Sequence, residues 1–392
     1  MKLLIYSHFF APSIGGVENV VQSLAAGLAS LQTHDADQEF EVTVVTQTDA
    51  GKSDEAAYPF HIVRRPGLFQ LWRIICDCDV IHLAGPALFQ LFLGLLARKP
   101  IVLEHHGYQA VCPNGLLVHQ PDGAVCPGHF QARRYHECWH CQKAELSPLR
   151  ACVSMLFMFP RYWLSRRAAS NLAITHHVLE RQALPRSSVI HYGVGDLIES
   201  SIASAPHPVP RKLSFAYVGR FVPEKGIAVL LNASALLSKD GHEFEVLLIG
   251  DGPQRPEIES RIRRYALDSL VRITGYLGGE ALAQVLRNVH AVIMPSVWEE
   301  TAGLAVIEHM MRGRLVIASK IGGLAEVVDD AALTFPPGDS QALADVMKTV
   351  LQNPSIIEVF GRKARDRALR FFRRERMIED HARVYRELLR TE

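Results

Sequence analysis

The sequence contains no apolar run long enough to cross a membrane. Of its 392 residues 48% are hydrophobic, but the best candidates, ALFQLFLGLLA (87–97) and SMLFMFPRYWL (154–164), fall short of the roughly 18 apolar residues that a spanning helix needs. The start, MKLLIYSHFFAPSIGG, lacks a complete signal-peptide core because Ser7, His8 and Pro12 interrupt its apolar run. We therefore expect a soluble, cytoplasmic protein whose first residues form a buried strand.

A strong excess of charge of either sign is also absent. The 42 basic and 41 acidic side chains leave a formal net charge of +1. No global field would therefore attract nucleic acid, and we expect no nucleic-acid partner. Fixed-period repeats and low-complexity tracts are missing as well, which argues against a repeat architecture.

Two motifs of familiar enzyme classes are not found where they would be needed. The stretch SIGGVENV follows the first expected strand, where a nicotinamide enzyme would carry Gly-x-Gly-x-x-Gly. The Asp-x-Asp candidate DCD (77–79) precedes an expected buried strand and so does not form a metal-binding turn. The sequence thus disfavours a nicotinamide oxidoreductase.

What the sequence does contain is a regular alternation of short β-branched runs and helical patterns. KLLIYS, EVTVVTQ, DVIHLAG and IVLEHH are expected strands of the first half; LSFAYVGR, FEVLLIGDG, VRITGYL, HAVIMPS, RLVIASK and ALTFPPG are those of the second. The Pro-rich stretch 204–213 separates the two halves and is expected to be a linker. This pattern predicts an α/β fold with two doubly wound, Rossmann-like domains, residues 1–205 and 206–370, because the chain is too long for one core.

Ligands of such folds bind beyond the carboxyl ends of the strands, so the turns there are candidate sites. In the first turn Gly15 and Gly16 precede a helix whose free amides can take an anion. In the second, Arg220 and Lys225 share a short loop and suit a diphosphate. Each pair also fits a plainer role, as turn-shaping glycines or solvated cations.

The third turn lies in WEETAGLAVIEHMMRG (298–313), which carries two acids eight residues apart. In a continuous helix Glu300 and Glu308 would be about 12 Å apart along the axis, beyond the spacing of roughly 5 to 9.5 Å used by paired hydrolase carboxylates. Glu300 is instead expected in a loop, and Glu308 on the first turns of a helix that begins near Gly303. There Glu308 could bind a ribose diol or simply cap the helix.

Together these turns resemble the large family of retaining glycosyltransferases with the GT-B fold, glycosyltransferase family 4, also called glycosyl transferases group 1. The resemblance rests on PSVWEETAGLAVIEHMMRGRLVIASKIGGLAEVV (295–328) with its E-x7-E spacing, and on GRFVPEKG (219–226), IGDGP (249–253), IHYGV (190–194) and Gly15-Gly16. It covers nearly the whole chain. It implies two Rossmann-like domains facing across a cleft, with the last residues, 371–392, returning to the first domain.

The resemblance also implies roles for individual residues. Arg220 and Lys225 match the diphosphate-binding pair, Glu308 the ribose-binding acid and Glu300 the acid that contacts the donor sugar. His106, ahead of Cys112-Pro113, matches a histidine that faces this sugar, for which His105 is the weaker candidate. The implied catalytic set is His106, Glu300, Arg220 and Lys225, and the implied donor-binding set is Gly15, Gly16, Gly219, Arg220, Lys225, Gly252, Gly303, Leu304, Ala305 and Glu308.

The implied reaction moves a sugar from a nucleotide diphosphate, a UDP- or GDP-sugar, to a glycan, lipid-linked or small-molecule acceptor with retained configuration. Cations and a helix start would stabilise the leaving diphosphate, so that catalysis needs no metal ion or other cofactor. Tyr192 replaces an asparagine common in the family, and the HHG segment lacks a frequent His-Asp pair, which leaves sugar and acceptor open. A sugar-nucleotide sensor or an epimerase on the same fold is the alternative.

Four of the seven cysteines, Cys112, Cys126, Cys138 and Cys141, fall within thirty residues, in an expected insertion of the first domain at 107–150. Cys138 and Cys141 form a C-x2-C pair, a common half of a zinc site. The sequence therefore favours a structural zinc ion, for which His129, His136 and His140 are substitute ligands, over a set of buried inert thiols.

Two stretches hint at peripheral contact with a membrane, which would place the enzyme at its inner face. The first is the aromatic MLFMFPRYWLSRR (155–167), and the second is GRKARDRALRFFRRER (361–376), with eight basic and two acidic residues. A core helix and a solvated face remain equally open for them.

Overall fold

The computed structural model describes residues 1–13, 15–33, 37–51, 55–196 and 212–390. The chain divides into two compact units. The first unit comprises Met1–Gly195 and Arg373–Glu392, and the second comprises Asp196–Phe372. The predicted domain boundary between residues 205 and 206, and residues 204–211 of the predicted linker, lie outside the described residues.

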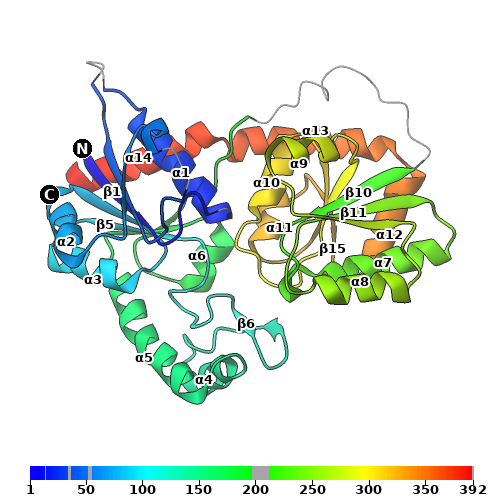
Figure 1. Ribbon diagram of the computed structural model, residues 1–392, viewed down its shortest axis with the longest axis horizontal. Helices are drawn as coiled ribbons and strands as arrows, with labels where there is room; N and C mark the ends of the chain where they lie inside the picture. Colours follow the sequence, from blue (N-terminus) through cyan, green and yellow to red (C-terminus); the bar gives the residue numbers. More distant parts are fainter. Residues whose placement is uncertain (14, 34–36, 52–54, 197–211, 391–392) are drawn as a thin grey trace. The chain divides into compact units, whose positions relative to one another are not determined.

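The first unit is built on a parallel sheet, in which Figure 1 labels β1 and β5. The strand order of this sheet is β3-β2-β1-β4-β5-β8-β9. Its strands are β1 (Lys2–Ser7), β2 (Glu41–Thr46), β3 (His61–Arg64), β4 (Val80–Ala84), β5 (Ile101–His105), β8 (Ser170–Ala173) and β9 (Ser187–Val189). The four predicted strands are β1, β2, β4 and β5. The three that the sequence did not indicate, β3, β8 and β9, are three or four residues long, too short for a pattern of alternating side chains to stand out.

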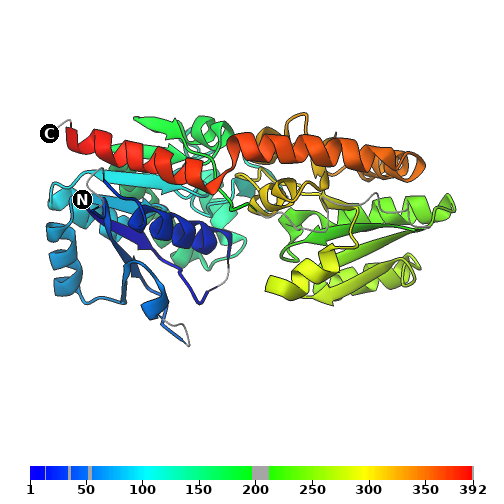
Figure 2. The ribbon, with the colours of Figure 1, turned by 90° about the horizontal axis from the view of Figure 1, so that it is seen from above.

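The helices of this unit are α1 (Gly16–Ala29), α2 (Leu68–Asp77), α3 (Leu88–Leu96), α4 (Tyr135–Lys143), α5 (Pro148–Ser165), α6 (His176–Gln182) and α14 (Arg374–Arg390). Most of them cover the sheet with an apolar stripe, whereas α4 packs on α5, and α5 packs on α3. Leu71 of α2 and Leu91 of α3 join Leu4 of β1 in one buried cluster. The last helix, α14, packs along α1, and Ile378 lies so close to Gly27 that an added Cβ there would be 2.0 Å from its Cδ1 (Figure 2).

The second unit contains a parallel six-stranded sheet with the order β12-β11-β10-β13-β14-β15. Its strands are β10 (Leu213–Val218), β11 (Phe244–Ile249), β12 (Val271–Gly275), β13 (Ala291–Met294), β14 (Leu315–Ser319) and β15 (Leu333–Phe335), each within a predicted strand. The order reverses between β10 and β13. That reversal is where open α/β sheets bind their ligands.

Alternate residues of these strands face opposite helix layers. Phe215 of β10 lies in a cluster with α7, α8 and α12, whereas Ala216 beside it packs with Leu286 of α9. The helices of this unit are α7 (Ile227–Lys239), α8 (Arg255–Arg264), α9 (Gly279–Leu286), α10 (Leu304–Met311), α11 (Gly322–Val328), α12 (Ser340–Gln352) and α13 (Ser355–Phe371). Among the described residues, no helix has the length and hydropathy of a membrane span.

Candidate functional site

The loops that follow β10 and β13 meet in an ion pair. Lys225 ends a 3-10 turn (Pro223–Lys225) after β10, and its Nζ lies 2.5 Å from Oε1 of Glu300 in the loop after β13. Glu300 is only 4% exposed, and Ser296 Oγ donates to the same oxygen over 2.7 Å. Burial alone raises the pKa of Glu300, but Lys225 and the hydrogen bond from Ser296 outweigh it, so the pKa is lowered and the carboxylate is charged.

A glycine allows the two loops to come this close. Gly226 has φ +67°, and a Cβ there would lie 1.9 Å from the carbonyl oxygen of Pro295. The Val297 N–H donates to the Glu224 carbonyl over 3.0 Å and joins the loops a second time. The glycine after the predicted diphosphate-binding loop therefore serves close packing, which places Lys225 against Glu300.

The loop after β11 is joined to the loop that carries Arg220. The Gly219 N–H donates to Ile249 and the Phe221 N–H to Asp251, over 3.0 and 2.9 Å. Gly252 lies so near that a Cβ would be 2.5 Å from the Phe221 carbonyl oxygen. Arg220 itself is exposed, and its guanidinium makes no hydrogen bond or ion pair within the described part of the chain. A cation held on a fixed loop is thus open to solvent.

Helix α10 begins beside the Glu300 loop. Gly303, with φ +78°, is its N-cap, and the Gly323 N–H holds the Glu300 carbonyl at 2.7 Å. In the described chain the N–H groups of Leu304 and Ala305 have no acceptor, as is usual for a first helical turn. Free amides and the helix dipole favour an anion at this point.

Glu308 lies one turn further into α10. Burial raises its pKa, and the neighbouring Arg312 partly offsets that rise. Its carboxylate accepts no hydrogen bond from any residue that the structure describes. Such an acid would gain from two hydroxyl donors, which a ribose diol provides.

In the first unit, His106 belongs to a buried cluster around Glu104 of β5. Glu104 is 1% exposed; its Oε2 lies 3.2 Å from Nε2 of His82 in β4 and 3.3 Å from Nε2 of His106. His381 of α14 approaches the other oxygen at 3.5 Å, an electrostatic contact longer than an ordinary hydrogen bond. Burial raises the pKa of Glu104, but the histidines outweigh it and the net pKa falls well below its usual value.

Tyr192, which stands where the resembling family commonly has asparagine, contacts His106. Its hydroxyl lies 2.8 Å from Nδ1 of His106, and the two rings are nearly parallel. Burial, then Glu104, raise the pKa of Tyr192, so the phenol keeps its proton and is available to donate to Nδ1. With Nδ1 as acceptor, a neutral His106 ring carries its hydrogen on Nε2, the nitrogen that lies 3.3 Å from Glu104. His105 instead bonds Asn171 over 2.9 Å and is buried.

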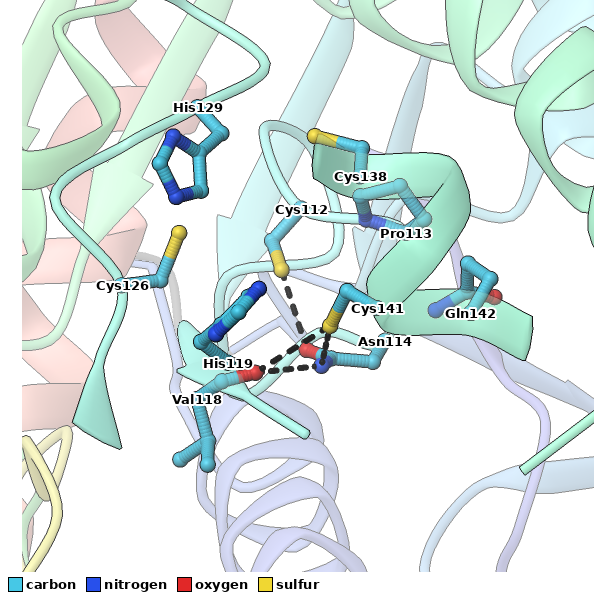
Figure 3. A pocket seen from close by; sticks show the side chains of 10 residues that line it. All are labelled: Cys112, Pro113, Asn114, Val118, His119, Cys126, His129, Cys138, Cys141 and Gln142. Carbon is cyan, nitrogen blue, oxygen red and sulfur yellow. Dashed lines mark hydrogen bonds between the residues drawn. The ribbon is translucent and has the colours of Figure 1, made fainter. Parts of the chain in front are cut away.

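The remaining predicted residues of the first unit lie at two places. Gly15 is the N-cap of α1, and the carboxylate of Glu18 lies beside it, so that a Cβ on Gly15 would be 2.2 Å from Oε2. Negative charge therefore already occupies the surroundings of Gly15 and Gly16, whose donor-binding role stays a prediction. The four predicted metal ligands line one cavity, shown in Figure 3: Cys112, Cys126, Cys138 and Cys141.

Sequence reasoning missed several polar side chains that complete these clusters. Ser296 was visible as the end of a predicted strand, but its bond to Glu300 was not. Glu104 and His82 lie inside apolar strands, where a polar residue among buried neighbours is a signal worth following. The contact of His381 with Glu104 spans 277 positions of sequence, by the difference of the residue numbers, and no local pattern indicates it.

The chain is similar to known proteins in sequence and in fold. Residues 202–367 match the family model "Glycosyl transferases group 1". Over 210 residues the chain is 33% identical to 2-deoxystreptamine glucosyltransferase of Streptomyces kanamyceticus, covering 49% of this chain and 54% of that protein. Alpha-D-kanosaminyltransferase of the same organism is 30% identical over 150 residues, 38% of this chain and 39% of that one. The chain thus spans about half the length, or less, of these relatives.

Solved structures match along the whole chain. HepE of Anabaena, crystallised with UDP and glucose, superposes with a TM-score of 0.71 at 18% identity and covers 99% of this chain and 100% of its own. Sucrose-phosphate synthase of Thermosynechococcus elongatus has a TM-score of 0.69 at 21% identity, with full coverage of both chains.

These matches define the fold as GT-B, the two-domain α/β fold of nucleotide-sugar glycosyltransferases, as the sequence predicted. Within that fold, residues 202–367 match the family that the sequence resembles, glycosyl transferases group 1, and the relatives named above are sugar transferases by name.

Proposed function

We propose that this protein is a retaining glycosyltransferase of family 4 that moves a hexose from a UDP- or GDP-sugar to a glycan, lipid-linked or small-molecule acceptor. The observation that carries the proposal is the Lys225–Glu300 pair at the carboxyl ends of β10 and β13, beside the start of α10. Binding of UDP and glucose by HepE, which shares the fold, supports the choice of donor.

The demanding chemical step is departure of the diphosphate. An ammonium group has three donors, so Lys225 can keep Glu300 and still donate to a phosphate oxygen. Arg220, exposed on the same loop, adds a planar fork, and the amides of Leu304 and Ala305 add two donors. Charge that develops on the leaving group would be stabilised by groups already in place, without a metal ion.

Glu300 and Glu308 would hold the two ends of the donor. The Glu308 carboxylate would accept hydrogen bonds from the ribose hydroxyls, and Glu300, fixed by Lys225 and Ser296, would accept from the sugar. We also propose that His106 acts on the donor sugar, with its ring orientation set by Tyr192 and Glu104.

Nucleotide binding can be tested first, and the chemical reaction after it. The melting temperature should rise with one of UDP, GDP and ADP. Glu308→Ala should reduce that rise, while Glu280→Ala, at an exposed position of α9, should not. An unchanged response of Glu308→Ala would contradict its ribose role.

The stereochemistry and cofactor requirement need a product. With the donor identified, NMR of the glycoside should show the donor's anomeric configuration, and the rate should not depend on added Mg²⁺. A protein that binds the nucleotide but forms no glycoside with any acceptor class would be the sensor, and one that only converts the donor's sugar would be the epimerase.

For the acceptor we propose a lipid-linked molecule at a membrane surface, on account of α5. The exposed residues of this helix are mostly apolar, with Arg150 among them: Leu149, Val153, Leu156, Phe157, Phe159 and Trp163. Leu156 is 69% exposed, and the exposed Arg167 lies over the Trp163 ring at 4.2 Å, an arrangement suited to anionic lipid headgroups.

The second predicted membrane stretch, 361–376, supports this less, because Arg362, Arg365 and Arg367 already pair with acidic side chains. Sedimentation with phosphatidylglycerol vesicles tests the proposal. Wild-type protein should sediment, and the double variant Leu156→Ser/Trp163→Ser should not. Equal sedimentation of both, or of neither, would contradict it.

A further inference from the structure

We propose that Cys112, Cys126, Cys138 and Cys141 bind one structural Zn²⁺ ion as thiolates in the first unit. The four cysteines lie on three separate parts of the chain that otherwise share little regular structure. Cys112 lies in a turn after β5, Cys126 follows the hairpin of β6 (Val118–His119) and β7 (Ala124–Val125), and the other two lie on α4. All four side chains converge on one cavity (Figure 3).

The other three cysteines of the chain do not line this cavity. Cys76 and Cys152 are exposed, Cys78 is buried elsewhere in α2's core cluster, and none of the seven forms a disulfide. The four clustered side chains are each between 6% and 8% exposed. Cysteines are often buried without a metal, but four from three segments that line one cavity make the set that a tetrahedral ion requires.

Two of the sulfur atoms now make thiol contacts with oxygen atoms. Sγ of Cys112 donates to Oδ1 of Asn114 over 3.0 Å, and Sγ of Cys141 donates to the Val118 carbonyl over 3.5 Å, so a bound ion would replace these contacts. The Cys141 sulfur accepts from the Gln120 N–H and from Asn114 Nδ2, each over 3.4 Å. Hydrogen bonds from N–H groups to a coordinating sulfur are the outer support that metal ligands usually have.

Two histidines also line the cavity and are the alternative ligands for an ion there. Nε2 of His119 and Nδ1 of His129 are buried and lack a hydrogen-bond partner in the described structure. His136 and His140, which the sequence offered as substitutes, do not line it; His136 is 70% exposed and pairs with Glu137. We assign the ion to the four sulfurs because they form a complete tetrahedral set by themselves, and the histidines are the alternative that the variants below test.

Metal binding would draw these groups together. Among the described residues no three of the cluster's ligand atoms all lie within 4.8 Å of one another, whereas sulfurs bound to zinc at about 2.3 Å would be closer. Cys138 and Cys141 are one helical turn apart on α4, so the loops that carry Cys112 and Cys126 would move toward this helix on binding. Binding would release the thiol protons to solvent.

The ion would stabilise a segment with a small apolar core. The buried cluster under α4 and α5 consists of Phe130, Cys138, Met155 and Met158. Segments with so little core commonly depend on a metal. The same segment begins at His106 and is tied to α6, where Gln182 Nε2 donates to the Gly107 carbonyl over 2.6 Å. A bound ion would therefore fix the chain that follows His106.

Metal analysis of the full chain, expressed with added zinc and gel-filtered, tests this proposal. About one zinc per chain is expected in the wild type and in Cys76→Ser, the matched control. Cys126→Ser and Cys138→Ser should lose most of it, and His119→Ala should retain it. Loss in His119→Ala with retention in Cys126→Ser would overturn the four-sulfur assignment.

Wild-type protein alone supplies the second measurement, in case the cysteine variants do not fold. Replacement of zinc by Co²⁺ should produce the absorption of a tetrahedral thiolate complex, and a chelator should lower the melting temperature. Absence of zinc from the wild type, or iron with acid-labile sulfide in its place, would overturn the proposal. Neither result bears on the nucleotide-binding residues of the second unit.

Discussion

Each unit of the protein holds a buried glutamate near the carboxyl end of a strand, and the two glutamates differ in their partners. Glu104 in the first unit is surrounded by His82, His106 and His381 and is closed off from solvent. Glu300 in the second unit pairs with one lysine, whose side chain is 23% exposed. A carboxylate whose partners are all internal can position other groups, whereas one whose partner reaches solvent can share that partner with a ligand.

The largest expected effect breaks the ligand-facing pair. Lys225→Ala should lower kcat/KM about 10³-fold, or about 4 kcal/mol, because the leaving phosphate loses a positioned cation. Steady-state kinetics should show no such loss for Lys239→Ala, an exposed lysine at the end of α7. If the activity of Lys225→Ala stayed within about threefold of the parent, Lys225 would serve only as the partner of Glu300, and its role toward the leaving phosphate would be contradicted.

A second change separates the loops without removing a charge. Gly226→Ala should lower the free energy of unfolding by about 3 kcal/mol, because its Cβ cannot fit beside the Pro295 carbonyl and its φ is positive. Gly241→Ala, also at positive φ but with no atom within 4 Å, should cost only about 1 kcal/mol. Equal costs in urea unfolding would contradict the close approach.

The enclosed glutamate should matter more for stability than for binding. Glu104→Gln should lower the free energy of unfolding by about 3 kcal/mol, because a buried charged cluster loses its anion. Glu39→Gln breaks the partly exposed pair with Arg386 and should cost about 1 kcal/mol. If Glu104→Gln also weakened binding of the nucleotide as strongly as Glu308→Ala, the contrast between the two units would fail.

The smallest effect is a pH dependence of the first unit. Burial lowers the pKa of His105 from 6.5 to about 4, so its neutral form is favoured in the folded state. As the pH falls, His105 of the unfolded chain takes up its proton near pH 6.5, before His105 of the folded chain does. The stability that the buried neutral ring contributes is therefore present above pH 6.5 and is lost as the pH falls toward 4. His105→Gln should remove about 2 kcal/mol of the change in unfolding free energy between about pH 6.5 and about pH 4.5. An unchanged slope would contradict the buried neutral histidine.

Much of the second unit could be predicted because its information is local. All six strands and the Arg220, Lys225 and Gly303 turns lie in short strand–turn–helix segments, where side-chain period and glycine placement directly reflect the backbone. Prediction was weaker in the first unit. Its short strands β3, β8 and β9 carry little period, and the partners of His106 come from segments far apart in sequence.

The sequence by itself determined the alternating α/β architecture, the glycine turns and the two acids of the E-x7-E stretch, since these follow from neighbours a few residues apart. Tertiary structure alone decided that Lys225 meets Glu300 across 75 positions, that Tyr192 orients His106, and that four dispersed cysteines share one cavity. The reason is physical: burial and pairing of polar groups depend on which strands lie side by side, and strand order is a property of the folded chain.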